Sequence, residues 1–155
     1  MNLVTKNDIE TTKLGENIGK LLKDNTTVYL IGEMASGKTQ LSKGIAKSLG
    51  LISEFSSPTY TIINEYKDGV NILYHMDAYR IEDISELDYI GFYDIYKKHK
   101  MIIEWADMIM DELDYSGIIV NIEKSTNDFN ERNINIKALD EESKDIIDKL
   151  EEMYV

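Results

Sequence analysis

The residues best suited to chemistry in this chain run from Gly32 to Thr39 and read Gly-Glu-Met-Ala-Ser-Gly-Lys-Thr. The pattern G-x-x-x-x-G-K-T is typical of a loop that binds phosphate groups. Its two glycines let the backbone curl, so that successive N–H groups point at one anion. Lys38 would then reach the β- and γ-phosphates, and the Thr39 hydroxyl would ligate Mg²⁺. The motif therefore predicts a nucleoside triphosphate and Mg²⁺ as ligands.

The segments on either side of this loop support that interpretation. Residues 26–31 are β-branched or apolar and predict a buried strand. After the loop, Leu41, Ile45 and Leu49 recur every four residues, which predicts one face of a helix that ends at Gly50. A strand, a glycine loop and a helix in this order aim a helix N-terminus at a phosphate. The alternative is a glycine-rich turn that binds nothing.

Two acidic residues could complete such a site. A phosphate loop needs a second acid to hold Mg²⁺, usually at the end of a neighbouring apolar strand. Glu104 follows the apolar residues 101–103, and Asp77 ends the run 72–76. Position alone does not choose between them, although Glu104 follows the purer apolar run. Asp77 could instead orient the attacking water, or it could be an ordinary carboxylate that pairs with Arg80.

A hydroxyl-rich loop, Ser56-Ser57-Pro58-Thr59, lies between the predicted helix and the next strands. Such a loop can order itself on a γ-phosphate in the manner of a switch loop. Serine and proline are also common in plain turns, and the loop taken alone favours a turn.

Four further residues have side chains that could act in a binding or catalytic site: Trp105, Arg132, His75 and His99. Trp105, the only tryptophan, could stack on a base, but beside a buried strand a core position is more typical. Arg132 could contact phosphate, although a surface position is more typical. His75 and His99 have no partner at a characteristic spacing, so no catalytic role is assigned to them.

The rest of the chain predicts the elements that must position these residues. The Asp68-Gly69 turn between two apolar runs predicts a hairpin, and its place directly after the phosphate-loop helix predicts a mixed sheet. The expected fold is α/β, a three-layer sandwich of the P-loop NTPase type, in one domain spanning 1–155. The other expected elements are a helix at 8–23, hairpin strands at 60–66 and 71–77, short helices within 84–98 that break near Gly91, a strand at 101–105, a short helix at 107–113, antiparallel strands at 117–123 and 132–138, and an acidic C-terminal helix within 139–155.

Composition narrows the classes of function. The 155 residues carry a formal net charge of −12, which makes a broad basic face for nucleic acid a poor expectation. No stretch approaches the length of a membrane span, and the N-terminus lacks a signal pattern, so a cytoplasmic protein is expected. The absence of cysteine excludes disulfides and thiolate metal sites. The acidity after Leu139 favours a solvated helix face over a docking surface.

Taken in order, these segments resemble the TsaE (YjeE) family from about Glu10 to about Ala138. The phosphate loop alone is shared by a large superfamily, whereas the combination S-P-T, H-x-D-x-Y-R and E-W at this spacing is specific. The matching pieces are Glu10-Thr11-x-x-Leu14-Gly15, Gly32 to Thr39, Ser57-Pro58-Thr59-Tyr60-Thr61, Tyr74 to Arg80, Glu86-Leu87 with Gly91, and Ile103-Glu104-Trp105.

The resemblance implies an ATPase with Mg²⁺ as its metal. It implies that the loop binds ATP phosphates, that residues 57–59 act as a switch element, and that Asp77 is needed for hydrolysis. The implied catalytic residues are Lys38, Thr59, Asp77 and Glu104; the implied metal ligands are Thr39 and Glu104; and the implied nucleotide-binding residues are Thr11, Glu33, Met34, Ala35, Ser36, Gly37, Lys38, Thr39, Gln40, Trp105 and Arg132.

The family's role implies a partner complex as well. Its ATPase serves the TsaD-like and TsaB-like proteins that make threonylcarbamoyladenosine on tRNA, so this chain would meet tRNA only indirectly. Turnover by the isolated chain is expected to be slow, because a switch loop completed by a partner leaves the isolated site incomplete.

Two other functions remain open at this point. A small-molecule kinase would need an acceptor pocket and usually a lid bearing arginines, yet Arg80 and Arg132 are the only arginines. A nucleotide-gated binding module, in which hydrolysis is incidental, is the third hypothesis.

Overall fold

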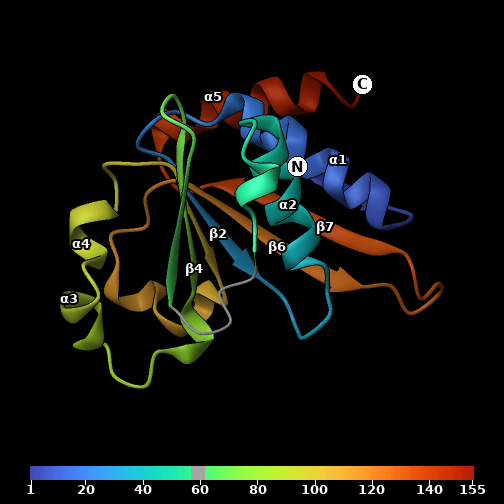
Figure 1. Ribbon diagram of the computed structural model, residues 1–155. Coiled ribbons are helices and arrows are strands. Elements are labelled where there is room, and N and C mark those ends of the chain that lie inside the picture. The colour runs from blue at the N-terminus through green and yellow to red at the C-terminus, as the bar shows by residue number, and fades with distance from the viewer. Residues whose placement is uncertain (57–61) are drawn as a thin grey trace.

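The computed structural model describes residues 1–56 and 62–155, and Figure 1 labels their main elements. Short 3₁₀ turns also occur at Ile52–Glu54, Ala78–Arg80, Ala106–Met108 and Met110–Glu112. The helices and strands are β1 (Asn2–Thr5), α1 (Asp8–Leu21), β2 (Thr27–Ile31), α2 (Lys38–Ser48), β3 (Ile63–Lys67), β4 (Ile72–Asp77), α3 (Glu86–Tyr89), α4 (Phe92–Ile95), β5 (Met101–Glu104), β6 (Ile118–Lys124), β7 (Arg132–Ala138) and α5 (Glu141–Glu152).

The described strands form a seven-stranded mixed sheet in the order β1-β7-β6-β2-β5-β4-β3. The central strands β6, β2, β5 and β4 are mutually parallel, whereas β1/β7, β6/β7 and β3/β4 are antiparallel pairs. In register, Glu104 of β5 lies opposite Leu30 of β2 on one side and Asp77 of β4 on the other. The carboxyl ends of these parallel strands therefore meet at one edge of the sheet.

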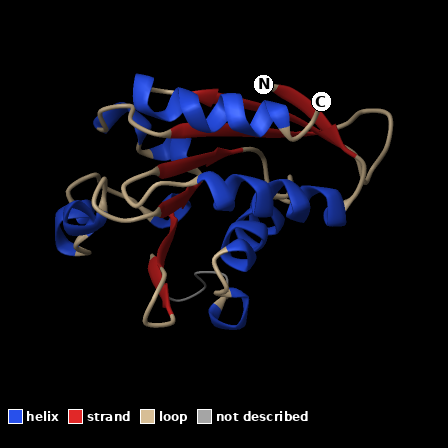
Figure 2. Cartoon of the chain, turned by 90° about the horizontal axis from the view of Figure 1, so that it is seen from above, coloured by secondary structure: helices blue, strands red, loops and turns tan. Residues whose placement is uncertain are grey.

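Helices cover both faces of the sheet, which confirms the predicted three layers (Figures 1 and 2). Alternate residues of β2 explain this arrangement, because successive side chains of a strand point to opposite faces. Val28 and Leu30 belong to the core under α1, α2 and α5, whereas Tyr29 belongs to the core under α3 and α4. All three side chains are fully buried.

Helices α1 and α2 meet at backbone contact, and glycine makes this approach possible. A Cβ atom on Gly15 would lie 2.2 Å from the Leu41 carbonyl oxygen, and one on Gly44 would lie 2.0 Å from the Thr12 carbonyl oxygen. Helix α2 starts at the phosphate loop, so its contact with α1 also fixes the position of the loop.

Most of the expected elements are confirmed, with two differences. The short strand β1 was not predicted, because four residues are too few for an alternating pattern to stand out; it pairs with β7. The expected helix at 107–113 is wrong: Ile109, with φ −130°, separates two 3₁₀ turns there. Residues 60 and 61 of the first hairpin strand lie outside the described part. Within that part, none of the helices has the length and apolar content that spanning a membrane requires.

Candidate nucleotide-binding site

The predicted phosphate loop connects the end of β2 to the start of α2. Positive φ angles at Ala35 (60°) and Gly37 (111°) curl its backbone. Helix α2 begins without a side-chain cap and without an acidic residue in its first turn. By contrast, α1 and α5 are capped by Asn7 and Asp140 and carry acids in their first turns. The N-terminus of α2 is thus the one of these three that suits an anion.

The Lys38 ammonium lies inside the curl of the loop. Its Nζ donates to the carbonyl oxygens of Gly32 at 2.6 Å and Glu33 at 2.7 Å, and it lies 4.1 Å from the centroid of the Trp105 ring. Burial lowers the pKa of Lys38, while the negative charges of nearby acids, Glu104 first, oppose that shift. The site therefore combines a confined cation with surrounding carboxylates.

The two candidate acids lie side by side, as the strand order requires. Asp77 and Glu104 are register partners at the ends of β4 and β5. One oxygen of Asp77 accepts from the Tyr79 N–H at 3.1 Å, and the other accepts from Arg80 Nε at 3.4 Å. The local pair with Arg80 is thus present, and both of its members also line the cavity described below.

Glu104 is only 7% exposed and contacts groups from two other elements. Its Oε2 contacts Nε2 of His75 and lies 3.5 Å from the hydroxyl of Ser42. The assignment of no role to His75 missed this contact. A two-residue period along β4 could have indicated it, because His75 and Asp77 then share a face.

Arg132 is buried rather than exposed, so the expectation of a surface arginine is wrong. Its Nε donates to the Ser36 carbonyl at 2.8 Å, and Nη2 lies 3.4 Å from the Ala35 carbonyl. Nη1 donates to the Phe129 carbonyl at 2.7 Å. Because β7 starts beside the phosphate loop, Arg132 joins the loop to the turn between β6 and β7.

Trp105 follows β5 in a left-handed backbone conformation, with φ 58°. It is half-buried, packs against the second core and also lines the cavity, so it is not purely a core residue. Its ring centroid lies 4.9 Å from that of Tyr79. Trp105 therefore forms part of the wall next to Lys38.

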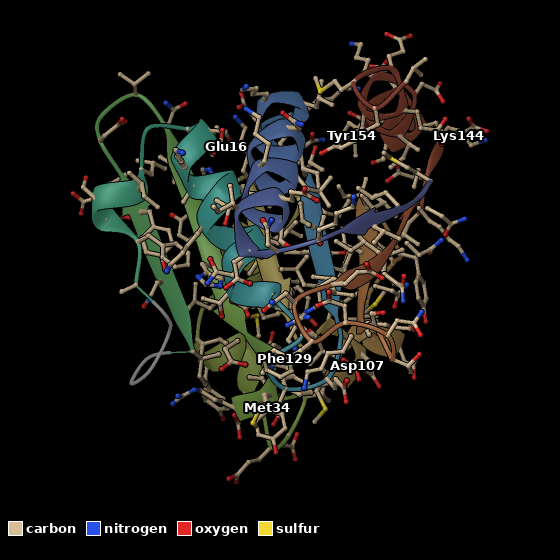
Figure 3. The ribbon with its side chains drawn as sticks, turned by 90° about the vertical axis from the view of Figure 1, so that its right-hand side faces the viewer. Glu16, Met34, Asp107, Phe129, Lys144 and Tyr154 are labelled. Atoms are coloured by element: carbon tan, nitrogen blue, oxygen red, sulfur yellow. The ribbon has the colours of Figure 1, made fainter. Side chains whose placement is uncertain are left out.

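A cavity of about 500 Å³ brings most of the predicted residues together. Figure 3 shows two members of its lining, Met34 and Phe129, at the end of the molecule away from Glu16 and Tyr154. The lining consists of Asp8, Met34, Ala35, Ser36, Gly37, Lys38, Thr39, Gln40, Asp77, Arg80, Glu104, Trp105, Phe129 and Arg132.

A family model described as "Threonylcarbamoyl adenosine biosynthesis protein TsaE" matches residues 5–134. The chain belongs to the TsaE family. The tRNA threonylcarbamoyladenosine biosynthesis protein TsaE of Bacillus subtilis (strain 168) is 36% identical over 135 residues, which are 87% of this chain and 84% of that protein. The protein of the same name from Treponema pallidum (strain Nichols) is 33% identical over 123 residues, 79% of this chain and 90% of that protein.

A solved structure is similar over the whole TsaE-family chain. The crystal structure of Bacillus subtilis YdiB has 28% sequence identity and a TM-score of 0.80, and the match covers 100% of this chain and 96% of that one. The likeness confirms the predicted α/β fold of the P-loop NTPase type.

Among the described residues of this TsaE-family chain, two that were predicted for the site, Glu33 and Thr11, do not line the cavity. Glu33 lines a neighbouring hollow together with Trp105 and Asp107. Thr11 is buried; its hydroxyl lies 2.8 Å from that of Thr5, and its methyl group would lie 3.7 Å from a Cβ on Gly37. Thr59 lies outside the described residues.

The predicted site lacked three residues of the lining: Arg80, which was considered only as a partner of Asp77, and Asp8 and Phe129, which were missed. Asp8 comes from the first turn of α1, and Phe129, 86% exposed, comes from the turn before β7. No motif marks either residue, and the spatial approach of these elements to the loop places them there.

The donors present fit a magnesium ion that is shared with a nucleotide. Within residues 1–56 and 62–155, no group of three or more His, Cys, Asp or Glu side chains is arranged to hold a metal ion. Mg²⁺ is usually bound by one or two protein oxygens together with substrate phosphates and waters. Thr39 and Glu104, both on the cavity wall, match that requirement.

Proposed function

We propose that this chain is a Mg²⁺-dependent ATPase that serves the modification of tRNA with threonylcarbamoyladenosine. One observation carries the ATPase proposal: the uncapped start of α2, Lys38, Asp77 and Glu104 meet in one cavity. Membership of the TsaE family supports the role in tRNA modification. The proposed setting is the cytoplasm, with TsaD-like and TsaB-like proteins as partners.

The phosphates of ATP would lie against the loop backbone and the first turn of α2. Lys38 now donates to the Gly32 and Glu33 carbonyls. A bound triphosphate would replace these carbonyls as the hydrogen-bond acceptor of the ammonium. A phosphate oxygen is a charged acceptor and forms stronger hydrogen bonds than a neutral carbonyl. Thr39 and Glu104 would hold the Mg²⁺ ion that bridges phosphate oxygens.

Water is the proposed phosphoryl acceptor. Asp77 would orient this water from the end of β4, next to Glu104. The protein's task in such a transfer is positioning and charge stabilisation. The predicted switch residues 57–59 lie outside the described part, and we propose that their completion by a partner sets the rate.

A kinase is the weaker alternative, because both arginines of the chain already interact with groups of the site. Arg132 donates to carbonyls of the phosphate loop, and Arg80 pairs with Asp77. Since the chain has no other arginine, none remains for a lid that would clamp a second substrate.

Hydrolysis by the purified chain tests the proposed reaction. With γ-labelled ATP, the label should appear as free phosphate. Asp77→Asn should lower kcat on the order of 100-fold, because the variant loses a positioned proton acceptor. Nucleotide binding, measured by Trp105 fluorescence, should be unchanged. Glu112→Gln, at an exposed position outside the cavity, should behave as wild type. Transfer of the label to a metabolite would instead favour the kinase.

A second experiment tests the role in tRNA modification. The tagged chain should retain TsaD-like and TsaB-like proteins from its own cell extract in an ATP-dependent manner. Cells that carry only Asp77→Asn should lose threonylcarbamoyladenosine from their tRNA. Full modification in those cells would favour a nucleotide-gated binding module in which hydrolysis is incidental.

A further inference from the structure

A chain of polar contacts leads from Glu104, through the buried side chains of His75 and Tyr66, to the backbone of Ser56. Oε2 of Glu104 contacts Nε2 of His75, Nδ1 of His75 lies 3.0 Å from the Tyr66 hydroxyl, and that hydroxyl contacts the Ser56 carbonyl oxygen. The Ser56 N–H also donates to the same hydroxyl at 3.4 Å. His75 is 0% exposed and Tyr66 is 2% exposed, so solvent has almost no access to the contacts of His75, whereas Ser56 at the far end is exposed.

Aromatic packing holds His75 in place. The Phe55 ring stacks on the imidazole with centroids 5.4 Å apart and 20° between the planes, and the Tyr66 ring lies 5.9 Å away. The ring centroids of Phe55 and Tyr66 are 5.5 Å apart, so these two rings also pack against each other. The imidazole is thus fixed by rings on β3 and on the segment that precedes residues 57–61.

The Glu104 carboxylate is constrained from the same side. A carboxylate can only accept, so His75 Nε2 is its donor, and the Ser42 hydroxyl, which donates to the Lys38 carbonyl at 2.9 Å, lies 3.5 Å from the same Oε2. In the part of the chain that the structure describes, no hydrogen bond reaches Oε1. The contacts therefore orient the carboxylate and leave its second oxygen for a cation.

We infer that His75 is a positioning residue that holds Glu104 for Mg²⁺ and, through Tyr66, couples the cation site to Phe55 and Ser56. This inference rests on the proposed Mg²⁺-dependent nucleotide binding. Groups that orient a metal ligand typically change metal affinity by about 10- to 100-fold when they are removed. Ser56 directly precedes the Ser57-Pro58-Thr59 sequence, so cation binding and the backbone next to that sequence share one set of contacts.

Two substitutions at His75 separate the two ends of this chain of contacts. A glutamine amide can reach the level of Nε2, so His75→Gln keeps a donor for Glu104. An asparagine amide reaches only the level of Nδ1, so His75→Asn keeps a partner for Tyr66 and loses Glu104. Tyr66→Phe removes the hydroxyl and leaves the contact between His75 and Glu104. Tyr74→Phe is the matched control, because its hydroxyl donates to Glu65 outside this chain of contacts.

Metal affinity is the first measurement. Trp105 lies on the cavity wall, so its fluorescence can report the Kd of ADP in EDTA and the Kd of Mg²⁺ at saturating ADP. His75→Asn should weaken Mg²⁺ binding about 10-fold and leave the Kd of ADP in EDTA unchanged. His75→Gln and Tyr74→Phe should stay within about 2-fold of wild type for both ligands, on the same basis.

Hydrogen–deuterium exchange tests the coupling to Ser56. With ADP bound, Mg²⁺ should slow the exchange of the Ser56 amide in the wild type, because this N–H donates to Tyr66. Tyr66→Phe and His75→Asn should lose this Mg²⁺-dependent protection, whereas Tyr74→Phe should keep it. If His75→Asn does not fold, the comparison of Tyr66→Phe with Tyr74→Phe still tests the coupling to Ser56.

Three results would overturn the inference. Wild-type Mg²⁺ affinity in His75→Asn would show that His75 does not position Glu104. An equal loss of Mg²⁺ and of Mg²⁺-free ADP binding would show a structural role only. Unchanged Mg²⁺-dependent protection of Ser56 in Tyr66→Phe would exclude the coupling. These results leave the proposed function intact, whereas a wild-type chain without Mg²⁺-dependent ADP binding would overturn both.

Discussion

At the residue scale, Arg132 shows how a single buried charge can shape the candidate site. Its guanidinium donates to carbonyl oxygens of Ser36, Ala35 and Phe129, so its donors are matched by backbone acceptors. Two of these carbonyls, those of Ser36 and Ala35, belong to the phosphate loop. Arg132 therefore acts on the shape of the loop through its carbonyls.

Arg132→Met should loosen the phosphate loop. Hydrogen bonds from a charged donor contribute about 1.5–3 kcal/mol each, so we expect the free energy of unfolding to fall by at least about 1.5 kcal/mol. The Kd of ADP should rise about 10-fold, which corresponds to a loss of about 1.4 kcal/mol in binding free energy. Urea unfolding and Trp105 fluorescence measure the two effects. Lys137→Met, exposed on the same strand, is the control, and equal behaviour of the two variants would contradict this role.

At the element scale, the contact between α1 and α2 supports the loop. Leu14, Ile18, Leu41 and Ile45 are fully buried between these helices and the sheet. Glycine rather than a larger residue at the crossing lets the backbones touch. The start of α2 is thereby fixed against α1 as well as against β2.

Gly44→Ala should push the two helices apart. The new Cβ would lie 2.0 Å from the Thr12 carbonyl oxygen, which is backbone and cannot rotate away. Overpacking of this kind costs about 1–3 kcal/mol, which should appear as a lower urea midpoint. Lys20→Ala, at an exposed position of α1, should leave the midpoint unchanged. An unchanged midpoint for Gly44→Ala would mean that the helices separate without cost.

The cap of α5 gives the protein a pH-dependent contribution to stability. Asp140 accepts from the Ser143 N–H at 2.7 Å and from the Gly117 N–H at 2.8 Å. Burial would raise the pKa of Asp140, but hydrogen bonding by the Ser143 side chain, followed by that of the Gly117 and Ser143 N–H groups, holds the pKa below its usual value. The stabilisation is therefore present above the unfolded pKa of about 3.9 and is lost as the pH falls through the lower folded value.

Asp140→Ala should remove this contribution. A lost N-cap costs about 0.5–2 kcal/mol at pH 7. Below about pH 4 the difference from wild type should shrink, because Asp140 is then protonated in the unfolded state and begins to protonate in the folded state. Urea unfolding from pH 7 to pH 3 measures the difference, with the exposed Asp148→Ala as control. A constant difference across this range would contradict a charged cap.

At the scale of the whole molecule, one sheet separates two cores, and the candidate site lies at its edge. The core under α1, α2 and α5 supports the phosphate loop, and the core under α3 and α4 supports Trp105. The 155-residue chain as a whole carries a net charge of −12. Its surface therefore repels polyanions, even though the cavity is suited to a triphosphate.

This charge predicts that the isolated chain binds tRNA poorly. Non-specific binding requires cations that neutralise backbone phosphates, with a Kd of about 10⁻⁴–10⁻⁶ M at physiological salt for proteins that have them. We expect the Kd for tRNA to be weaker than about 10⁻⁴ M in filter binding, and the addition of partner proteins to create binding. Micromolar binding by the chain alone would show a direct tRNA contact.

The sequence by itself determined the elements whose signals are local. The phosphate loop lies on contiguous residues between an apolar strand and an amphipathic helix, and Asp77 and Glu104 each end an apolar run. Such patterns are visible because neighbouring residues share one element and its hydrophobic period. The mixed sheet also followed from a local signal, the Asp68-Gly69 turn.

Only the tertiary structure decided which of these elements lie together. The order β2-β5-β4 brings Asp77 beside Glu104, and the pairing of β3 with β4 brings Tyr66 to His75. The position of β7 next to the loop converts a presumed surface arginine, Arg132, into a partner of loop carbonyls. Each arrangement depends on strand order and packing between residues far apart in the chain, which no local period encodes.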